Sequence, residues 1–223
     1  SEKLYDIFEE ANRIPAKWDE VPQYLKDATV AVEDKDFYRH QGLSTTGIMR
    51  GMLACIVLRR CQGGSTLTQQ LVKNVLLSQE RTFPRKMKEA VLAIQIERKY
   101  SKNDILLMYL NEAPYGGTAV GVKAASEHYF GKDVKNLTLV ESAVLSGFPQ
   151  SPTFYSPFTG EEGAYKTRAQ HVLRRMREDG YITPVQEGEA RKLLDTISFA
   201  PGDASLRAPH FVAYVKALLV EKF

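Results

Sequence analysis

Apolar residues recur at helical spacing from the first part of the chain onward. Four early apolar residues lie three or four positions apart, namely Val21, Leu25, Ala28 and Val32. This spacing places them on one face of an α-helix. Pro22 suits the first turn of that helix, because the N–H that proline lacks would have no helical partner there. The pattern therefore predicts an amphipathic helix over residues 22–34.

The same periodicity continues along the chain and predicts further helices. They are expected at residues 44–60, 66–79, 85–100, 102–111, 118–130, 138–147, 161–179, 184–194 and 208–222. Proline and glycine are interleaved with aromatic residues at 111–117 and 147–160, which is typical of ordered loops. Strand signals are weak, and we see no internal repeat or dividing linker. The sequence thus predicts a single, mainly α domain over residues 1–223.

Composition adds a mild preference for anionic partners. The 223 residues are 43% hydrophobic, which is enough for a proper core, and the net charge is +3. The basic residues that gather in the middle of the chain are Arg59, Arg60, Lys73, Arg81, Arg85, Lys86 and Lys88. Such a surplus favours an anionic ligand or surface. We expect no nucleic-acid partner.

The longest apolar stretch, "MLACIVL" at residues 52–58, is too short to span a bilayer. Arginines flank it, so it is either a buried helix, which the residues alone favour, or a segment that dips into a membrane. Cys55 and Cys61 are six residues apart, or about 9 Å along a helix axis. A local disulfide between them is therefore not expected if the stretch is helical.

Acidic residues crowd the C-terminal end of the helix predicted at 22–34. Glu33, Asp34 and Asp36 would face the negative end of the helix dipole, which costs about 0.3 to 1 kcal/mol per charge and tends to raise a carboxyl pKa. The cluster is either used chemically or neutralised by its basic neighbours Lys35, Arg39 and His40. His40 alone is more typical of a structural histidine, and the cluster matches no metal-ligand spacing.

Glu89 is a second candidate acid. On a helix that starts near Pro84, it shares a face with Arg85 and Ile96. Burying an unpaired carboxylate there would cost several kcal/mol, so we expect an ion pair with Arg85. Such a pair is compatible with a structural or a functional role.

The stretch "GGSTLTQQLVKN" at residues 63–74 is unusually rich in hydrogen-bonding groups. Ser65 or Thr66 can cap a helix, and the N-terminus of that helix offers free N–H groups to an anion. The spacing of a nucleotide P-loop is absent. An ordinary capped helix would leave the polar stripe of Gln69, Gln70 and Lys73 unexplained. With Arg81, Arg85 and Lys86, these groups could converge on a diphosphate.

Several motifs occur together in a familiar order. They are "EDKDFYRHQG", "GGSTLTQQLVKN", "RKMKE", "ILLMYLN", "GVKAASEHYFGK", "ESAVLSGFPQSPTFYSP" and "RAQHVLRRM". Over roughly residues 20–180 the chain resembles the peptidoglycan glycosyltransferases of family 51, found in class A penicillin-binding proteins and monofunctional transglycosylases. It departs from them at Leu107, where the family commonly has glutamate, and at Ala169, where it commonly has a second arginine.

The resemblance implies a lysozyme-like helical head lobe with a smaller, membrane-associated jaw lobe. It implies polymerisation of lipid II into β-1,4-linked glycan strands, with inversion and release of undecaprenyl diphosphate. It favours membrane contact for part of residues 44–62. The expected setting is the outer face of the bacterial cytoplasmic membrane, with residues 1–223 belonging to a longer, membrane-anchored chain. Expected partners are lipid II, the growing glycan, an anionic membrane surface and phosphoglycolipid inhibitors of the moenomycin type.

The resemblance also implies residue roles. Glu33 corresponds to the general base and Glu89 to the second acid of the site. The expected substrate-binding residues are Asp34, His40, Ser65, Thr66, Gln69, Gln70, Lys73, Arg81, Arg85 and Lys86. No residue is assigned to a metal with certainty, and a divalent cation such as Mg²⁺ at the diphosphate remains an option.

Two other functions compete with this interpretation. A lysozyme-like hydrolase or lytic transglycosylase shares the fold and an essential glutamate, but its leaving group is a sugar, so it has no need of a row of cations. A catalytically idle module that binds anionic lipid would depend on the cations and tolerate loss of Glu33 and Glu89.

Overall fold

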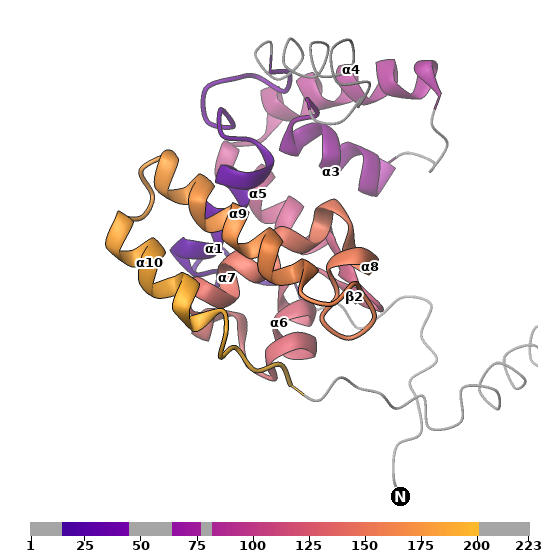
Figure 1. Cartoon of the computed structure of the whole chain (residues 1–223). Coiled ribbons are helices and arrows are strands. Elements are labelled where there is room, and N and C mark those ends of the chain that lie inside the picture. Colours follow the sequence, from indigo (N-terminus) through magenta and orange to yellow (C-terminus); the bar gives the residue numbers. More distant parts are fainter. Residues whose placement is uncertain (1–14, 45–63, 77–81, 201–223) are drawn as a thin grey trace, which may run out of the picture.

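The computed structural model describes residues 15–44, 64–76 and 82–200 and is built almost entirely of helices (Figure 1). The helices are α1 (Gln23–Glu33), α3 (Leu67–Leu76), α4 (Phe83–Lys99), α5 (Lys102–Glu112), α6 (Val122–Phe130), α7 (Leu139–Gly147), α8 (Pro152–Tyr155), α9 (Ala164–Glu178) and α10 (Pro184–Leu193), with short 3₁₀ turns η1 (Val134–Asn136) and η2 (Phe148–Gln150). Two short strands, β1 (Pro114–Gly116) and β2 (Ala119–Val120), pair antiparallel.

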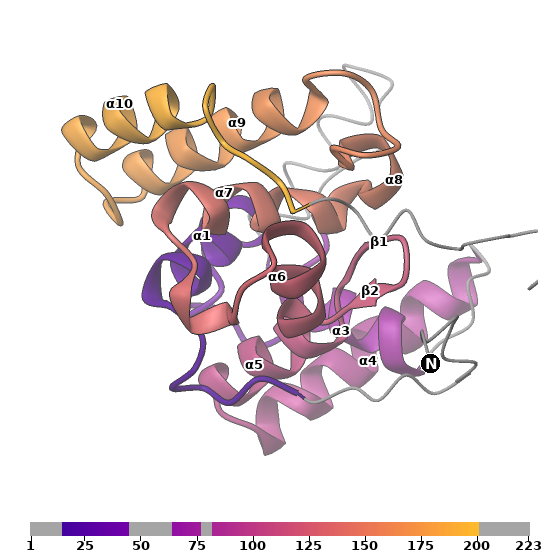
Figure 2. The ribbon, with the colours of Figure 1, turned by 90° about the horizontal axis from the view of Figure 1, so that it is seen from below.

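A large helix group forms around α1, α7 and α9, which pack against one another. Helix α10 lies along α9 on the outside of this group, and α6 packs against α7 (Figure 2). Leu25, Leu145 and Leu173 are fully buried between these helices. Burying a leucine side chain contributes about 1.5 to 3 kcal/mol, so this apolar centre holds the end of α1 in place.

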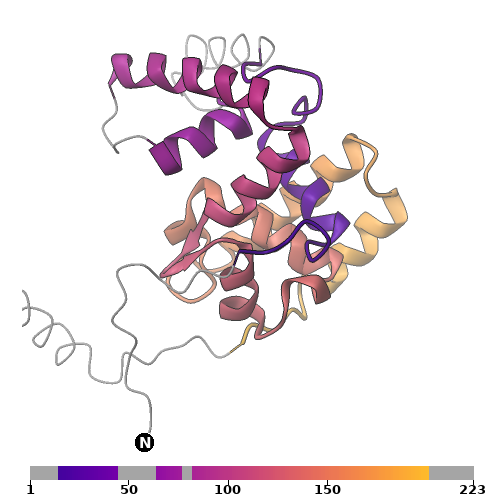
Figure 3. The ribbon, with the colours of Figure 1, turned by 180° about the vertical axis from the view of Figure 1, so that it is seen from behind.

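A small helix group consists of α3, α4 and α5 (Figure 3). Helix α3 packs against both of the others, and α5 leads from this group back to α6. Leu67 and Leu71 of α3 and Leu106 of α5 belong to the same apolar cluster as the leucines of the large group. One core therefore joins the two groups.

Local sequence sets many of the helix ends. Capping boxes, in which the N-cap side chain and the third helical residue satisfy each other's backbone N–H, open α5, α7 and α10. Gly131 ends α6 in the left-handed conformation, with φ of 62°. Glycine adopts this conformation without the steric cost that other residues incur.

The mainly α fold that the sequence predicted is confirmed, with local differences. The helix expected at 118–130 begins at Val122, because Ala119 and Val120 pair with β1 instead. The loop expected at 147–160 contains the short turns η2 and α8. The helix expected at 208–222, the apolar stretch at 52–58, and Cys55 and Cys61 lie outside the described residues, as does the helix expected at 44–60 apart from its first residue, Ser44.

Within residues 15–44, 64–76 and 82–200, no helix has both the length and the apolar character needed to cross a bilayer.

The packing of α9 predicts a contrast between two leucines. Leu173→Ala should lower the free energy of unfolding by about 2 to 5 kcal/mol, because it opens a cavity between α1, α7 and α9. Leu193→Ala, at a position that is 57% exposed on α10, should change it by less than about 0.5 kcal/mol. Urea denaturation of both variants measures the difference, and equal effects would contradict the packing described.

Candidate functional site

Glu33 is the last residue of α1 and lies where the two helix groups meet. Its side chain is 10% exposed. Gln70 of α3 donates from Nε2 to Glu33 Oε2 (2.9 Å), and Arg168 of α9 donates from Nη2 to Oε1 (3.4 Å). The Tyr109 hydroxyl donates to Gln70 Oε1 (3.4 Å) and thereby orients that amide. Donors from two other helices thus fix the carboxylate.

Two hollows meet at Glu33. The first, which we call the central cleft, has a volume of about 660 Å³. Its polar lining includes Glu33, Ser65, Gln70, Lys73, Gln150, Ser151, Arg168 and His171. The second is smaller, about 330 Å³, and is also lined by Glu33, Ser65 and His171, with Lys35 and Arg174 on other sides. A carboxylate shared by two adjoining spaces can contact ligands in both.

Two buried tyrosines border the carboxylate. Burial raises the pKa of Tyr109 well above its ordinary value, and the negative charge of Glu33 raises it further. The pKa of Tyr115 is raised for the same two reasons. Both phenols therefore stay protonated, so they act near Glu33 as neutral groups.

His171 stands at the junction of the hollows as a neutral imidazole. Burial lowers its pKa, and the positive charges of Arg168, Arg174 and Arg175 lower it further. Arg168 Nη1 lies 3.5 Å from His171 Nδ1, so the guanidinium donates to that nitrogen.

A second acidic centre lies on α4. Glu89 is 2% exposed, and its carboxylate pairs with Arg85 Nη1 (3.1 Å) and with Lys86 Nζ. The predicted Arg85–Glu89 pair is therefore confirmed. Lys86 Nζ also donates to Ser65 Oγ (2.8 Å), and Ser65 lines the central cleft. Glu89 thus holds two cations, one of which reaches the wall of the cleft.

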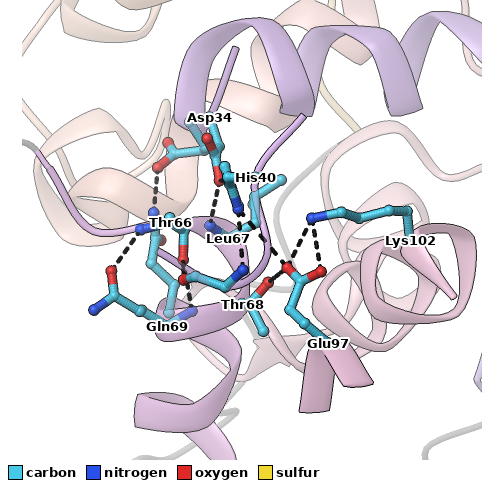
Figure 4. Close-up of polar contacts among 11 residues, drawn as sticks. Asp34, His40, Thr66, Leu67, Thr68, Gln69, Glu97 and Lys102 are labelled. Carbon is cyan, nitrogen blue, oxygen red and sulfur yellow. Dashed lines mark hydrogen bonds and ion pairs between the residues drawn. The ribbon is translucent and has the colours of Figure 1, made fainter. Parts of the chain in front are cut away.

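Asp34 and His40 lie in a buried network (Figure 4), although Asp34 also lines the smaller hollow, as does Thr66. Asp34 Oδ2 accepts from the Leu67 backbone N–H (3.0 Å) and lies 2.9 Å from His40 Nε2. The Gly42 N–H donates to His40 Nδ1 (3.2 Å), so Nε2 carries the proton given to Asp34. These contacts fasten the start of α3 to the end of α1.

Thr66 and Gln69 cap α3 from inside the protein (Figure 4). The Thr66 N–H donates to Gln69 Oε1 (3.0 Å), and the Gln69 N–H donates to Thr66 Oγ1 (3.2 Å). The Thr66 hydroxyl donates to the Gly42 carbonyl (2.7 Å). Both side chains are buried, so the capping role is clear, whereas a substrate contact stays a prediction.

A buried ion pair at the α4–α5 turn extends this network. Glu97 accepts from Thr68 Oγ1 (2.6 Å) and from Lys102 Nζ (2.7 Å) (Figure 4). Sequence reasoning missed it, because Glu97 and Lys102 belong to different predicted helices and have no motif of their own.

The predicted site residues separate into three sets. Glu33, Ser65, Gln70 and Lys73 line the central cleft. Arg85, Lys86 and Glu89 form the cluster on α4, while Asp34, His40, Thr66 and Gln69 form the buried support. Arg81 lies outside the described residues. Sequence reasoning assigned no role to Arg168 or His171, although both belong to the quoted motif "RAQHVLRRM".

Within the part of the chain that the structure describes, no group of three or more His, Cys, Asp or Glu side chains is arranged to hold a metal ion. The carboxylate of Glu89 is already engaged by two cations. The described residues therefore show no set of ligands for a metal ion.

Comparison with known proteins agrees with the motifs. The transglycosylase family profile matches residues 1–177. Penicillin-binding protein 1A of Aquifex aeolicus is 44% identical over 189 residues, which are 84% of this chain and 26% of that protein. Penicillin-binding protein 1A of Vibrio cholerae is 39% identical over 222 residues, or 99% of this chain and 27% of that protein. The chain thus spans about a quarter of the length of these relatives.

A solved structure supports the same family for the fold. The crystal structure of penicillin-binding protein 1A from Haemophilus influenzae aligns with 95% of this chain and 21% of its own, with a TM-score of 0.56 and 25% identity. Its similarity supports the lysozyme-like helical arrangement expected from the motifs. Because the profile covers more than half of the chain, this protein belongs to the transglycosylase family, the peptidoglycan glycosyltransferases.

Proposed function

We propose that the chain polymerises lipid II by direct displacement, with Glu33 as the general base. The observation that carries this proposal is the Glu33 carboxylate, fixed by Gln70 and Arg168 between two adjoining hollows. One hollow would hold the growing glycan as donor and the other the incoming lipid II as acceptor. Membership of the transglycosylase family supports this choice of substrate.

The chemical step needs one base and no covalent intermediate. The 4-hydroxyl oxygen of the acceptor attacks the anomeric carbon of the donor while its proton passes to Glu33. The bond from that carbon to the diphosphate oxygen breaks, and undecaprenyl diphosphate leaves from the opposite face. One displacement inverts the anomeric centre, whereas a glutamate nucleophile would give retention.

The cations offset the negative charge of the leaving diphosphate. Lys73 lines the central cleft, and Lys86 reaches the same wall through Ser65. Prealigned cations stabilise an oxygen that gains negative charge in the transition state. Glu89 positions Arg85 and Lys86 and takes no proton. This arrangement favours a diphosphate over the sugar leaving group of a lysozyme-like hydrolase.

The buried residues next to the two hollows support the site, and two of them, Asp34 and Thr66, also line the smaller hollow. Asp34 and His40 hold the start of α3, while Thr66 and Gln69 cap it.

The substrate sets the cellular context. The lipid of a lipid-linked sugar stays in the bilayer, so the chain would work against an anionic membrane surface. It would do so as part of a longer anchored protein on the outer face of the bacterial cytoplasmic membrane. Phosphoglycolipids of the moenomycin type would compete for the same diphosphate site, since they present a phosphate and a lipid tail.

Arg168 reaches Glu33 across Gly147. Arg168 Nε donates to the Gly147 carbonyl (3.2 Å), and a Cβ at position 147 would lie 2.7 Å from Arg168 Cγ. That contact is too close for the arginine to keep its present path. The lack of a side chain at Gly147 therefore places the guanidinium beside the carboxylate.

Glu33→Gln tests the base. The variant is nearly isosteric but removes the charge that faces Arg168, so its melting temperature should fall by no more than a few degrees, while polymerisation should fall by at least about 100-fold. Labelled lipid II in detergent, with products separated by length on a gel, gives the rate. Glu127→Gln, on an exposed position of α6, is the matched control.

Retained turnover by Glu33→Gln would remove Glu33 as the base. Cleavage of polymeric peptidoglycan by the parent, without a ladder from lipid II, would instead favour the hydrolase.

Lys73→Ala tests the cation at the cleft. Loss of one charge-assisted contact to the diphosphate should lower kcat/KM by roughly 10- to 100-fold. Lys88→Ala removes the same charge from an exposed position of α4 and should leave the rate unchanged. Normal kinetics from Lys73→Ala would count against a role for this lysine in leaving-group departure.

Gly147→Ala tests the positioning of Arg168. The added methyl group should displace the guanidinium and lower kcat by about 10- to 100-fold, as expected when a site group moves by about 1 Å. Gly188→Ala on α10 meets no atom within 4 Å and should leave kcat unaltered. If both variants turn over normally, the Arg168–Glu33 contact has no part in the reaction.

A further inference from the structure

A third hollow of about 600 Å³ adjoins the central cleft. We call it the side pocket. Five residues line both spaces, namely Gln150, Phe154, Tyr155, Arg168 and His171. The mechanism proposed above gives the side pocket no occupant, although it begins where Arg168 holds Glu33.

The walls of the side pocket differ in chemistry. One is aromatic, formed by Tyr155 and by Phe154, whose side chain is 46% exposed. The Tyr155 hydroxyl donates to Gln150 Oε1 (3.3 Å), and Arg168 lies over the Tyr155 ring at 5.7 Å. These contacts hold the aromatic wall beside the cleft.

The other wall carries two carboxylates, Glu161 and Glu162. The Glu161 N–H donates to the Phe154 carbonyl (3.1 Å), which holds the backbone of this wall against that of the aromatic wall. Gly160 permits this turn, because a Cβ there would lie 2.3 Å from the Phe154 oxygen. Both acids are exposed, and neither side chain forms a hydrogen bond or ion pair with another described residue. Glu33, the acid that lines the central cleft, is paired with Arg168, so these two differ from it.

The negative charge of this wall indicates which part of the substrate the side pocket could bind. This step rests on the proposed function. The sugar rings of lipid II are neutral and its diphosphate is anionic, so carboxylates would not attract either. Its stem peptide carries a side-chain ammonium group when the third residue is a diamino acid. That group is a cation attached to an apolar chain, which matches an acidic wall opposite aromatic rings.

We propose that the side pocket binds the stem peptide of the sugar in the central cleft. Glu161 and Glu162 receive the side-chain ammonium, while Phe154 and Tyr155 cover its methylene groups. The peptide branches sideways from the sugar, so a pocket that shares a wall with the cleft can receive it while the sugar stays near Glu33. The chain would therefore prefer lipid II with a free amine.

Two substrates and two double variants test this inference. Lipid II with a free side-chain amine is compared with the same lipid II acetylated at that amine, by initial rates of polymerisation. The parent should show a kcat/KM about fivefold higher with the free amine, the upper range for an exposed charge pair. E161Q/E162Q should abolish that preference. E127Q/E189Q makes the same charge change at exposed positions on α6 and α10 and should keep it.

The possible failures are distinguishable. Equal rates of the parent with both substrates, or an undiminished preference in E161Q/E162Q, would overturn the side-pocket assignment while leaving the polymerase intact. Loss of the preference in E127Q/E189Q as well would also overturn it, because the effect would then follow net charge. A parent that makes no glycan from either substrate would overturn the proposed function and this inference together.

Discussion

The carboxylate of Asp34 joins the end of α1 to the start of α3, and the placement of the other site groups depends on this joint. Because Asp34 accepts a hydrogen bond from the Leu67 N–H, the first turn of α3 is held in space beside the end of α1, where Glu33 lies. One turn further, Gln70 then reaches the Glu33 carboxylate. Just before the helix, Ser65 meets Lys86 of α4. A single buried acid thus sets the position of Glu33 relative to the cations.

The site keeps its charges in partly or fully buried pairs. Glu33 faces Arg168, Glu89 faces Arg85 and Lys86, and Glu97 faces Lys102. Removing one member of such a pair leaves an uncompensated charge, which is costly away from water. Because bringing two opposite charges out of water offsets much of their attraction, these pairs fix the positions of the side chains more than they stabilise the fold. Glu161 and Glu162 differ from them, since neither forms an ion pair with another residue that the structure describes.

Much of the fold could be predicted from local pattern. The helical periods, the capping boxes and the turn at Gly131 depend on residues close together in sequence, so α1, α5, α7 and α10 began and ended within two residues of the prediction. The prediction was wrong at the start of α6, because β2 forms by pairing with β1 across a turn. For the site, motifs identified the acids and the cations as candidates, and their catalytic roles remain proposals.

The sequence by itself determined the mainly helical class, the family and the order of the candidate groups, since each depends on spacing along the chain. Only the tertiary structure decided which groups meet. It brought Arg168 from α9 to Glu33 across Gly147, and it placed Asp34, His40, Thr66 and Gln69 in a buried support. The physical reason is that contacts such as Glu33–Arg168 join residues 135 positions apart. Their formation depends on how the helices pack, which no local pattern records.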